Sequence, residues 1–160
     1  MKQSSQRAIQ VAVILMAALI AYRIAFPILP PDQQQIQQQI QYAAAQMQER
    51  SVGGALRVLS DHYIDDNGFT GDALKLMLMR ATRDATSIAV SVRSTQIDVR
   101  GESATSRSFV GVTVDRPSGN WSRASQEIVL TWKKERVNHL LIIPAKEWRV
   151  VSASYGSVDF

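Results

Sequence analysis

The sequence of 160 residues contains no cysteine. This absence excludes a disulfide framework, a thiolate nucleophile and a zinc site with cysteine ligands. The chain has only two histidines, His62 and His139, and neither belongs to a His-x-x-Glu-His or His-Glu-x-x-His pattern. A Gly-x-Ser-x-Gly motif is also missing. The sequence therefore predicts no cofactor and no metal site, and no pattern in it specifies a reaction.

Long apolar runs are equally scarce, since the chain has one such run, at its N-terminus. Residues 8–22 contain a single polar member, Gln10, and after Arg23 the apolar character resumes through Leu29. About 20 mostly apolar residues are needed for a helix to cross roughly 30 Å of hydrocarbon. Arg23 is tolerated if its guanidinium reaches the headgroups. We therefore expect residues 1–30 to form a transmembrane anchor, which includes Val11, Val13, Ile14, Leu15, Leu19, Ile20, Tyr22 and Phe26.

A cleaved signal peptide with its apolar region at residues 8–21 is the alternative to this anchor. Its best cleavage signal, Leu19-Ile20-Ala21, has a leucine where a small residue belongs, so the uncleaved anchor is favoured. Lys2 and Arg7 precede the apolar run and are expected to stay in the cytoplasm. The sequence thus predicts a single-pass membrane protein whose residues 31–160 form an extracytoplasmic domain, periplasmic in a Gram-negative cell.

The net charge is +4, from 18 lysines and arginines against 14 acidic residues. In the second half of the chain the arginines are spread singly, whereas proteins that bind nucleic acids cluster them beside stacking aromatic residues. We therefore predict no nucleic-acid partner. Solubilising positions on the wet face of a sheet account for these arginines.

Three helices are predicted after Pro30 and Pro31. The first runs from Asp32, a candidate N-cap, to Arg50, and a second runs from residue 55 to residue 63 after a break at Gly53-Gly54. A turn at residues 65–68 leads to a third helix capped by Thr70. The apolar stripe of the first helix is Ile36, Ile40, Ala43, Ala44 and Met47, and that of the third is Leu74, Met77, Leu78 and Ala81.

After Asp84 the apolar period changes from 3.6 to 2, which is typical of strands. Strands are expected over residues 88–99, with a bulge between Val92 and Ile97, and over residues 103–114, 125–135 and 148–155. Residues 137–143 are apolar enough for a fifth strand or a buried crossover. The predicted fold class is α+β: a transmembrane helix, then three helices packed on a curved antiparallel sheet of four to five strands.

Several local phrases resemble the nuclear transport factor 2-like superfamily, which has the cystatin-like cone fold. They are residues 56–63 (LRVLSDHY), residues 65–70 (DDNGFT) and residues 148–153 (WRVVSA), and the resemblance covers about residues 33–156. It implies a bent sheet wrapped around helices, with a cone-shaped cavity that different members use for isomerase or dehydratase chemistry, for ligand binding or for assembly. A membrane helix before such a domain also resembles a type IV secretion assembly factor.

The candidate functional residues are few. His62 adjoins Asp61 and could serve as a base, but neighbouring residues of a helix point about 100° apart, so Asp61 need not orient it. Trp121 with Arg116 and Arg123 suits an interface hot spot. We therefore expect a non-enzymatic scaffold or accessory subunit that contacts other subunits of a membrane complex and could form a homodimer. A small-ligand-binding or isomerase-like and dehydratase-like cone domain, and a secretion-channel assembly factor, are the alternatives.

Overall fold

The computed structural model describes residues 30–117, 119, 121–139 and 143–155. In this part of the chain the helices are α2 (Asp32–Gln48), α3 (Val52–Ala55) and α4 (Gly71–Thr82), with a 3-10 turn η1 (Leu56–Val58). The strands are β1 (Ser87–Arg100), β2 (Ser103–Asp115), β3 (Trp121–His139) and β4 (Ile143–Tyr155). The predicted α+β class is therefore confirmed, with three helices and, of the four to five strands expected, four in the described residues.

The predicted membrane anchor lies outside the described residues, apart from Pro30. Within the described ranges, none of the helices has the length and apolar character needed to span a bilayer.

The four strands form one antiparallel sheet in the order β1-β2-β3-β4. A register shift between Arg93 and Gln96 in β1, where Ser94 has a φ of 53°, confirms the predicted bulge. Residues 137–139 end β3, and Ile143 begins β4, so these described residues belong to the two long strands and not to a separate fifth strand. β3 is longer than predicted because its first residues pair with β2 and its last with β4.

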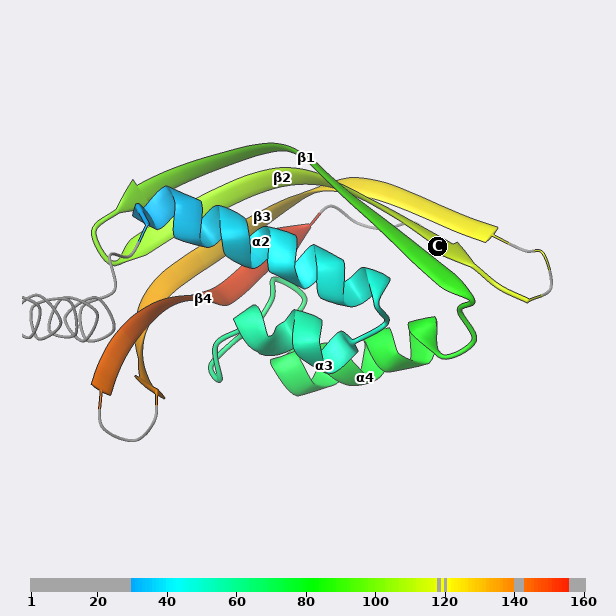
Figure 1. Ribbon diagram of the computed structural model, residues 1–160, viewed down its shortest axis with the longest axis horizontal. Coiled ribbons are helices and arrows are strands. Elements are labelled where there is room, and N and C mark those ends of the chain that lie inside the picture. The colour runs from blue at the N-terminus through cyan, green and yellow to red at the C-terminus, as the bar shows by residue number, and fades with distance from the viewer. Residues whose placement is uncertain (1–29, 118, 120, 140–142, 156–160) are drawn as a thin grey trace, which may run out of the picture. The chain divides into compact units, whose positions relative to one another are not determined.

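The sheet curves over the helices, which lie on its concave side (Figure 1). On β2 the alternate residues Ala104, Ser106 and Ser108 are buried, as the alternation predicted. Their partners on β3 are Trp132, Leu130 and Ile128. Even-numbered residues of β2 and of the paired part of β3 therefore face the helices, and odd-numbered ones face the convex side.

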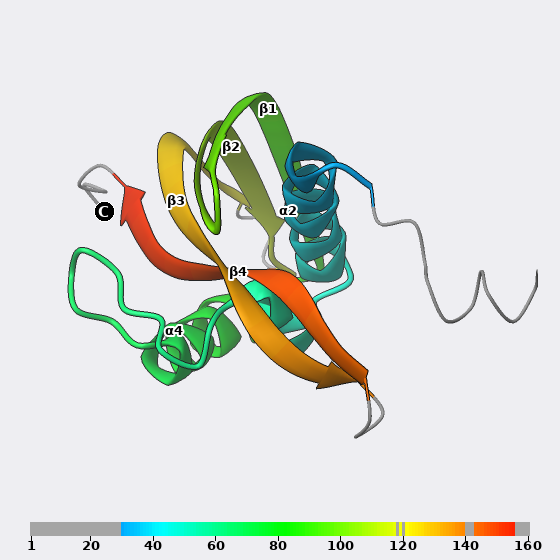
Figure 2. The ribbon, with the colours of Figure 1, turned by 90° about the vertical axis from the view of Figure 1, so that its left-hand side faces the viewer.

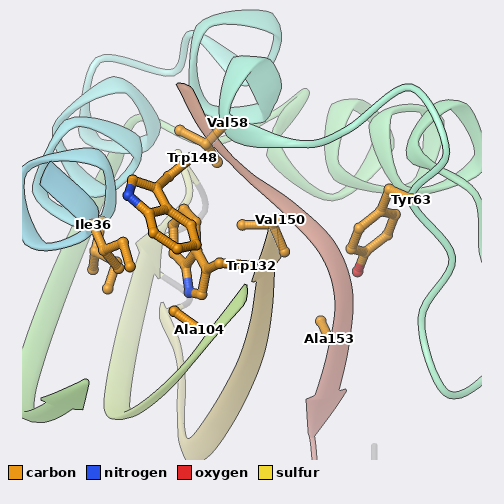
Figure 3. Packing of buried hydrophobic residues seen from close by; sticks show 9 residues of the cluster. Ile36, Val58, Tyr63, Ala104, Trp132, Trp148, Val150 and Ala153 are labelled. Atoms are coloured by element: carbon orange, nitrogen blue, oxygen red, sulfur yellow. The ribbon is translucent and has the colours of Figure 1, made fainter. Parts of the chain in front are cut away.

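The core lies between α2 and strands β2 to β4, where Trp132 and Trp148 pack beside Ile36 (Figure 3). Both indoles are almost fully buried. The Trp132 indole donates a hydrogen bond of 2.8 Å to Ser106 Oγ, so its only polar atom is satisfied. The buried cluster comprises Ile36, Ile40, Val58, Tyr63, Ala104, Trp132, Trp148, Val150 and Ala153.

The second predicted helix is wrong in its bounds. Gly53 and Gly54 lie inside α3 instead of breaking the chain, and the backbone becomes extended at Leu59, with a ψ of 147°. From there the chain pairs with β4. Ser60 N–H donates to the Val150 carbonyl at 2.8 Å, and Ile64 N–H donates to the Val151 carbonyl at 3.2 Å. These tertiary hydrogen bonds satisfy the backbone groups that a helix to residue 63 would have used.

The third predicted helix exists, and the side chain of Thr70 caps it by accepting a hydrogen bond from Ala73 N–H. Its predicted buried stripe is wrong, however. No residue of α4 is fully buried, Leu74 and Leu78 are half-buried, and Met77 and Ala81 are exposed. The helix lies farther from β1 and β2 than α2 does, as both views show (Figures 1 and 2). Because α2 already covers the core, α4 packs against the core only through Leu74.

Ile36→Ala should lower the free energy of unfolding by about 2–5 kcal/mol, because it leaves a cavity under the two tryptophans. Gln38→Ala, on the exposed side of α2, is the matched control and should change stability by about 0.5 kcal/mol or less. Urea titrations followed by tryptophan fluorescence measure both. Equal shifts for the two variants would contradict the placement of α2 in the core.

Candidate functional site

Asp65 is a buried carboxylate at the turn between η1 and α4. Its Oδ1 accepts hydrogen bonds from Asn67 N–H at 2.9 Å and from Phe69 N–H at 2.8 Å. Its Oδ2 accepts one from the Tyr155 hydroxyl at 2.5 Å. The predicted turn at residues 65–68 is therefore confirmed, and Asp65 also fastens it to the end of β4.

The hydrogen bonds of Asp65 decide its charge state. Burial acts to raise the pKa of Asp65, but the bonds from Tyr155, Phe69 and Asn67 outweigh it and hold the pKa below its usual range. Burial and then the same bond to Asp65 raise the pKa of Tyr155. At neutral pH the pair is an ionised carboxylate and a neutral phenol, joined by a charge-assisted hydrogen bond.

Asp32, at the start of α2, joins that helix to the sheet. Its Oδ1 accepts a hydrogen bond from the Trp148 indole at 3.1 Å and lies 2.7 Å from Lys134 Nζ. The Lys134 ammonium also lies 5.2 Å from the centre of the Trp148 ring, within range of a cation–π contact. The hydrogen bond from Lys134 is the main reason that the pKa of Asp32 is lowered, and that from Trp148 adds to it.

The considered acid–base candidates do not converge. Asp61 and His62 are both exposed, and His62 N–H donates to Ser60 Oγ, whose hydroxyl donates to Glu135 Oε1 at 2.6 Å. The side chain of His139 lies outside the described residues. Across the described ranges, no three His, Asp or Glu side chains gather as metal ligands. Ser60 and Glu135 were not among the predicted residues, because their contact joins positions 75 apart in sequence.

A polar cleft of about 480 Å³ lies between η1 and the start of α4. Two cationic residues, Arg57 and Lys75, and two acidic ones, Asp61 and Asp72, line it. Leu56, Leu59 and Gly71 also line it. The cleft can accept a small molecule that carries both signs of charge.

A second hollow of about 500 Å³ lies at the end of the sheet where β1 turns into β2. Arg100 and Asp98 on its rim form an ion pair of 2.7 Å. Arg107 lies 3.9 Å from Glu127. Because these charges are exposed and mutually paired, the hollow is a solvated part of the sheet surface.

The three predicted interface residues lie where β2 passes into β3, at the turn end of this hairpin. Trp121 begins β3 and is 68% exposed. Its register partner is Asp115, so its odd number places it on the convex side of the sheet, with the exposed Arg123 two positions on. Arg116 Nη1 donates a hydrogen bond of 3.3 Å to Ser122 Oγ, which holds this guanidinium beside the strand.

Comparison with known proteins identifies the fold. No family model matches the sequence, and no curated protein does so either. Among solved structures, it is similar to a proposed aromatic ring hydroxylase from Novosphingobium aromaticivorans, with 13% identity, 79% of this chain and 90% of that chain covered, and a TM-score of 0.65. It is also similar to a nuclear transport factor 2-like protein from Salmonella enterica, with 17% identity, coverage of 77% and 88%, and a TM-score of 0.58.

A third similar structure, from Catenulispora acidiphila, was solved in complex with S-DNPA and has 11% identity, coverage of 76% and 89%, and a TM-score of 0.57. At such identities the similarity defines the fold alone. The described domain has the cone fold of the nuclear transport factor 2-like proteins, as the sequence resemblance implied.

Tyr155→Phe should lower the free energy of unfolding by about 1.5–3 kcal/mol near neutral pH, because Asp65 then stays buried without its strongest donor. The folded-state pKa of Asp65 is lowered, so its contribution is complete above the unfolded value of about 4 and is lost as the pH falls below it. The difference between variant and parent should therefore shrink in acid. Tyr42→Phe, on an exposed tyrosine of α2, should be neutral at every pH. A constant difference for Tyr155→Phe from neutral pH into acid would contradict the charged pair. Urea titrations across the pH range measure all three proteins.

Proposed function

We propose that this chain is a non-enzymatic binding domain of a membrane complex. It contacts a protein partner through the end of the β2–β3 hairpin that carries Arg116, Trp121 and Arg123. The observation that carries the proposal is the exposure of Trp121, which at 68% exceeds that of every other large apolar side chain in the described residues. Transfer of this surface out of water would release about 4 kcal/mol, from roughly 170 Å² of apolar area.

The neighbourhood of Trp121 supports a protein partner. Arg116 and Arg123 lie on either side of it in sequence, and tryptophan and arginine are the residues most enriched in interface hot spots. Arg116 is held by Ser122, so less side-chain freedom is lost when a partner binds. A carboxylate-bearing partner surface would match the two guanidiniums.

The contacts of three acidic residues, of which Asp65 is buried and Asp32 and Glu135 are half-buried, also favour binding over catalysis. Asp32, Asp65 and Glu135 each accept hydrogen bonds that tie a helix or turn to the sheet. These carboxylates therefore hold the cone together, and their side chains are directed to contacts within the fold.

The membrane is the proposed site of action, because residues 1–30 have the length and composition of a single spanning helix with Lys2 and Arg7 on its cytoplasmic side. In this arrangement the cone domain is extracytoplasmic and the partner is another subunit of the complex. An assembly factor of a type IV secretion-like channel is one specific form of this proposal, which the identity of co-purified subunits would decide.

A small-ligand-binding domain is the second candidate, favoured by the cleft between η1 and α4. The cleft is lined by two cationic residues, Arg57 and Lys75, and two acidic ones, Asp61 and Asp72, which suit a zwitterion such as an amino acid. One of the similar structures was solved in complex with S-DNPA. Calorimetric titration with amino acids tests this candidate, and heat that Lys75→Ala abolishes would favour it over the protein partner.

Trp121→Ala should weaken capture of the partner by about 30-fold or more, because a hot-spot tryptophan contributes at least about 2 kcal/mol. Affinity purification of the full chain from membranes in mild detergent, with quantitative mass spectrometry, measures the loss. Phe109→Ala is the matched control, since Phe109 is also on the convex side and is 45% exposed. A partner retained equally by both variants would refute the hairpin site.

Carbonate washing of the same membranes tests the proposed anchor. If residues 1–30 span the bilayer, the chain stays in the membrane pellet.

A further inference from the structure

Helix α4 carries large apolar side chains that the described domain leaves uncovered. Leu76, Met77 and Met79 are 57%, 43% and 51% exposed, although they belong to a helix of 12 residues. The inner face of α4 uses Leu74, which packs against the core, and the half-buried Leu78. Leu76 and Met79 are three positions apart, so they share the outer face of the helix.

Cations surround this outer face. Lys75 precedes Leu76, Arg80 follows Met79, and Arg83 lies one turn beyond Met79. All three are exposed, and two exposed acids accompany them, Asp72 in the first turn of the helix and Asp84 directly after Arg83. Long basic side chains beside exposed leucine and methionine can keep their charges at lipid headgroups while the apolar atoms enter the acyl boundary.

We propose that α4 lies on the surface of an anionic lipid bilayer, with Leu76 and Met79 inserted shallowly and Lys75, Arg80 and Arg83 at the phosphates. This rests on the proposed membrane location, which would hold the domain close enough for a weak contact to persist. Each basic residue near an anionic surface strengthens binding by about fivefold at physiological ionic strength. The name outer α4 face is used below for these five residues.

A second copy of the chain fits the outer α4 face less well. A stable protein interface buries about 800 Å² on each partner, which is far more than the side chains along one face of a 12-residue helix supply. Two such faces would also bring three cations of each copy together against the two acids Asp72 and Asp84. A bilayer meets neither obstacle, because it offers negative charge and an apolar layer together.

This placement leaves the proposed partner site free. Helix α4 lies with α3 on the concave side of the sheet (Figure 1). Trp121 is on the convex side, by the register of β2 and β3. With α4 on the lipid, the convex side would be turned toward other proteins.

The test uses the full chain reconstituted in nanodiscs. Because the natural sequence has no cysteine, Met79→Cys gives one site for a fluorescent label, and Thr105→Cys on the convex side gives the control site. The lipids are phosphatidylcholine alone or mixed with phosphatidylserine, each with a nitroxide quencher near the top of the acyl chain. We expect strong quenching at position 79 in the anionic mixture, weaker quenching in phosphatidylcholine alone, and little at position 105 in either.

Replacement of the three cations by glutamine, Lys75→Gln with Arg80→Gln and Arg83→Gln, should reduce the docked population by about fivefold for each charge. These residues are exposed, so an unchanged thermal melt is expected and verifies folding. Equal quenching at positions 79 and 105, or quenching at 79 that the triple variant leaves unchanged, would overturn the proposal. Dipolar coupling between nitroxide labels at position 79 of two copies would also overturn it and assign the face to a homodimer.

Failure of the anchor and failure of this contact are distinguishable. If carbonate washing released the chain, the anchor would be wrong, and the labelled full chain would then be added to vesicles of the same two compositions. Quenching at position 79 that requires phosphatidylserine would support α4 docking even so. Absence of quenching on those vesicles would refute docking independently of the anchor.

Discussion

Strand β4 is paired on both of its edges, and the rest of the domain depends on this arrangement. On one edge it pairs with β3, and on the other it accepts backbone hydrogen bonds from Ser60, Ile64 and Asp66. Its inward side chains Trp148, Val150 and Ala153 form much of the core. Two of its side chains also bind carboxylates, since Trp148, in the middle of the strand, donates to Asp32, and Tyr155, at its end, donates to Asp65. An edge strand that would otherwise be open is therefore closed by the segment that joins the helices.

This use of polar groups separates the structural residues from the exposed ones. The carboxylates of Asp65 and Glu135 accept hydrogen bonds from within the fold, whereas large apolar side chains remain uncovered at the outer α4 face and at Trp121. The free energy falls when exposed leucine, methionine and tryptophan side chains are removed from water, so both places favour association. We infer a domain that works by contact, with one surface for lipid and one for a protein.

Sequence patterns predicted the elements well where the cause is local. The stripe containing Ile36 and Ile40, the cap at Thr70, the turn at Asp65 and the bulge after Val92 all follow from side-chain period or turn chemistry. Three features depended on distant contacts and could not be predicted. The chain beyond Leu59 becomes extended because it pairs with β4, α4 stays exposed because α2 occupies the core, and Ser60 meets Glu135 across the fold. The conspicuous Trp121 was found from composition, but its exposure required the structure.

The central claim is that Trp121 is covered by a partner in the native membrane. Hydroxyl-radical footprinting of the full chain tests it most directly, because oxidation of a side chain reports its access to solvent. The extent of oxidation at Trp121 is compared with that at Phe109, which is exposed on the same convex side. Our account predicts that the ratio of Trp121 to Phe109 oxidation is several-fold lower in native membranes than in the purified protein. An identical ratio in the two preparations would contradict the account.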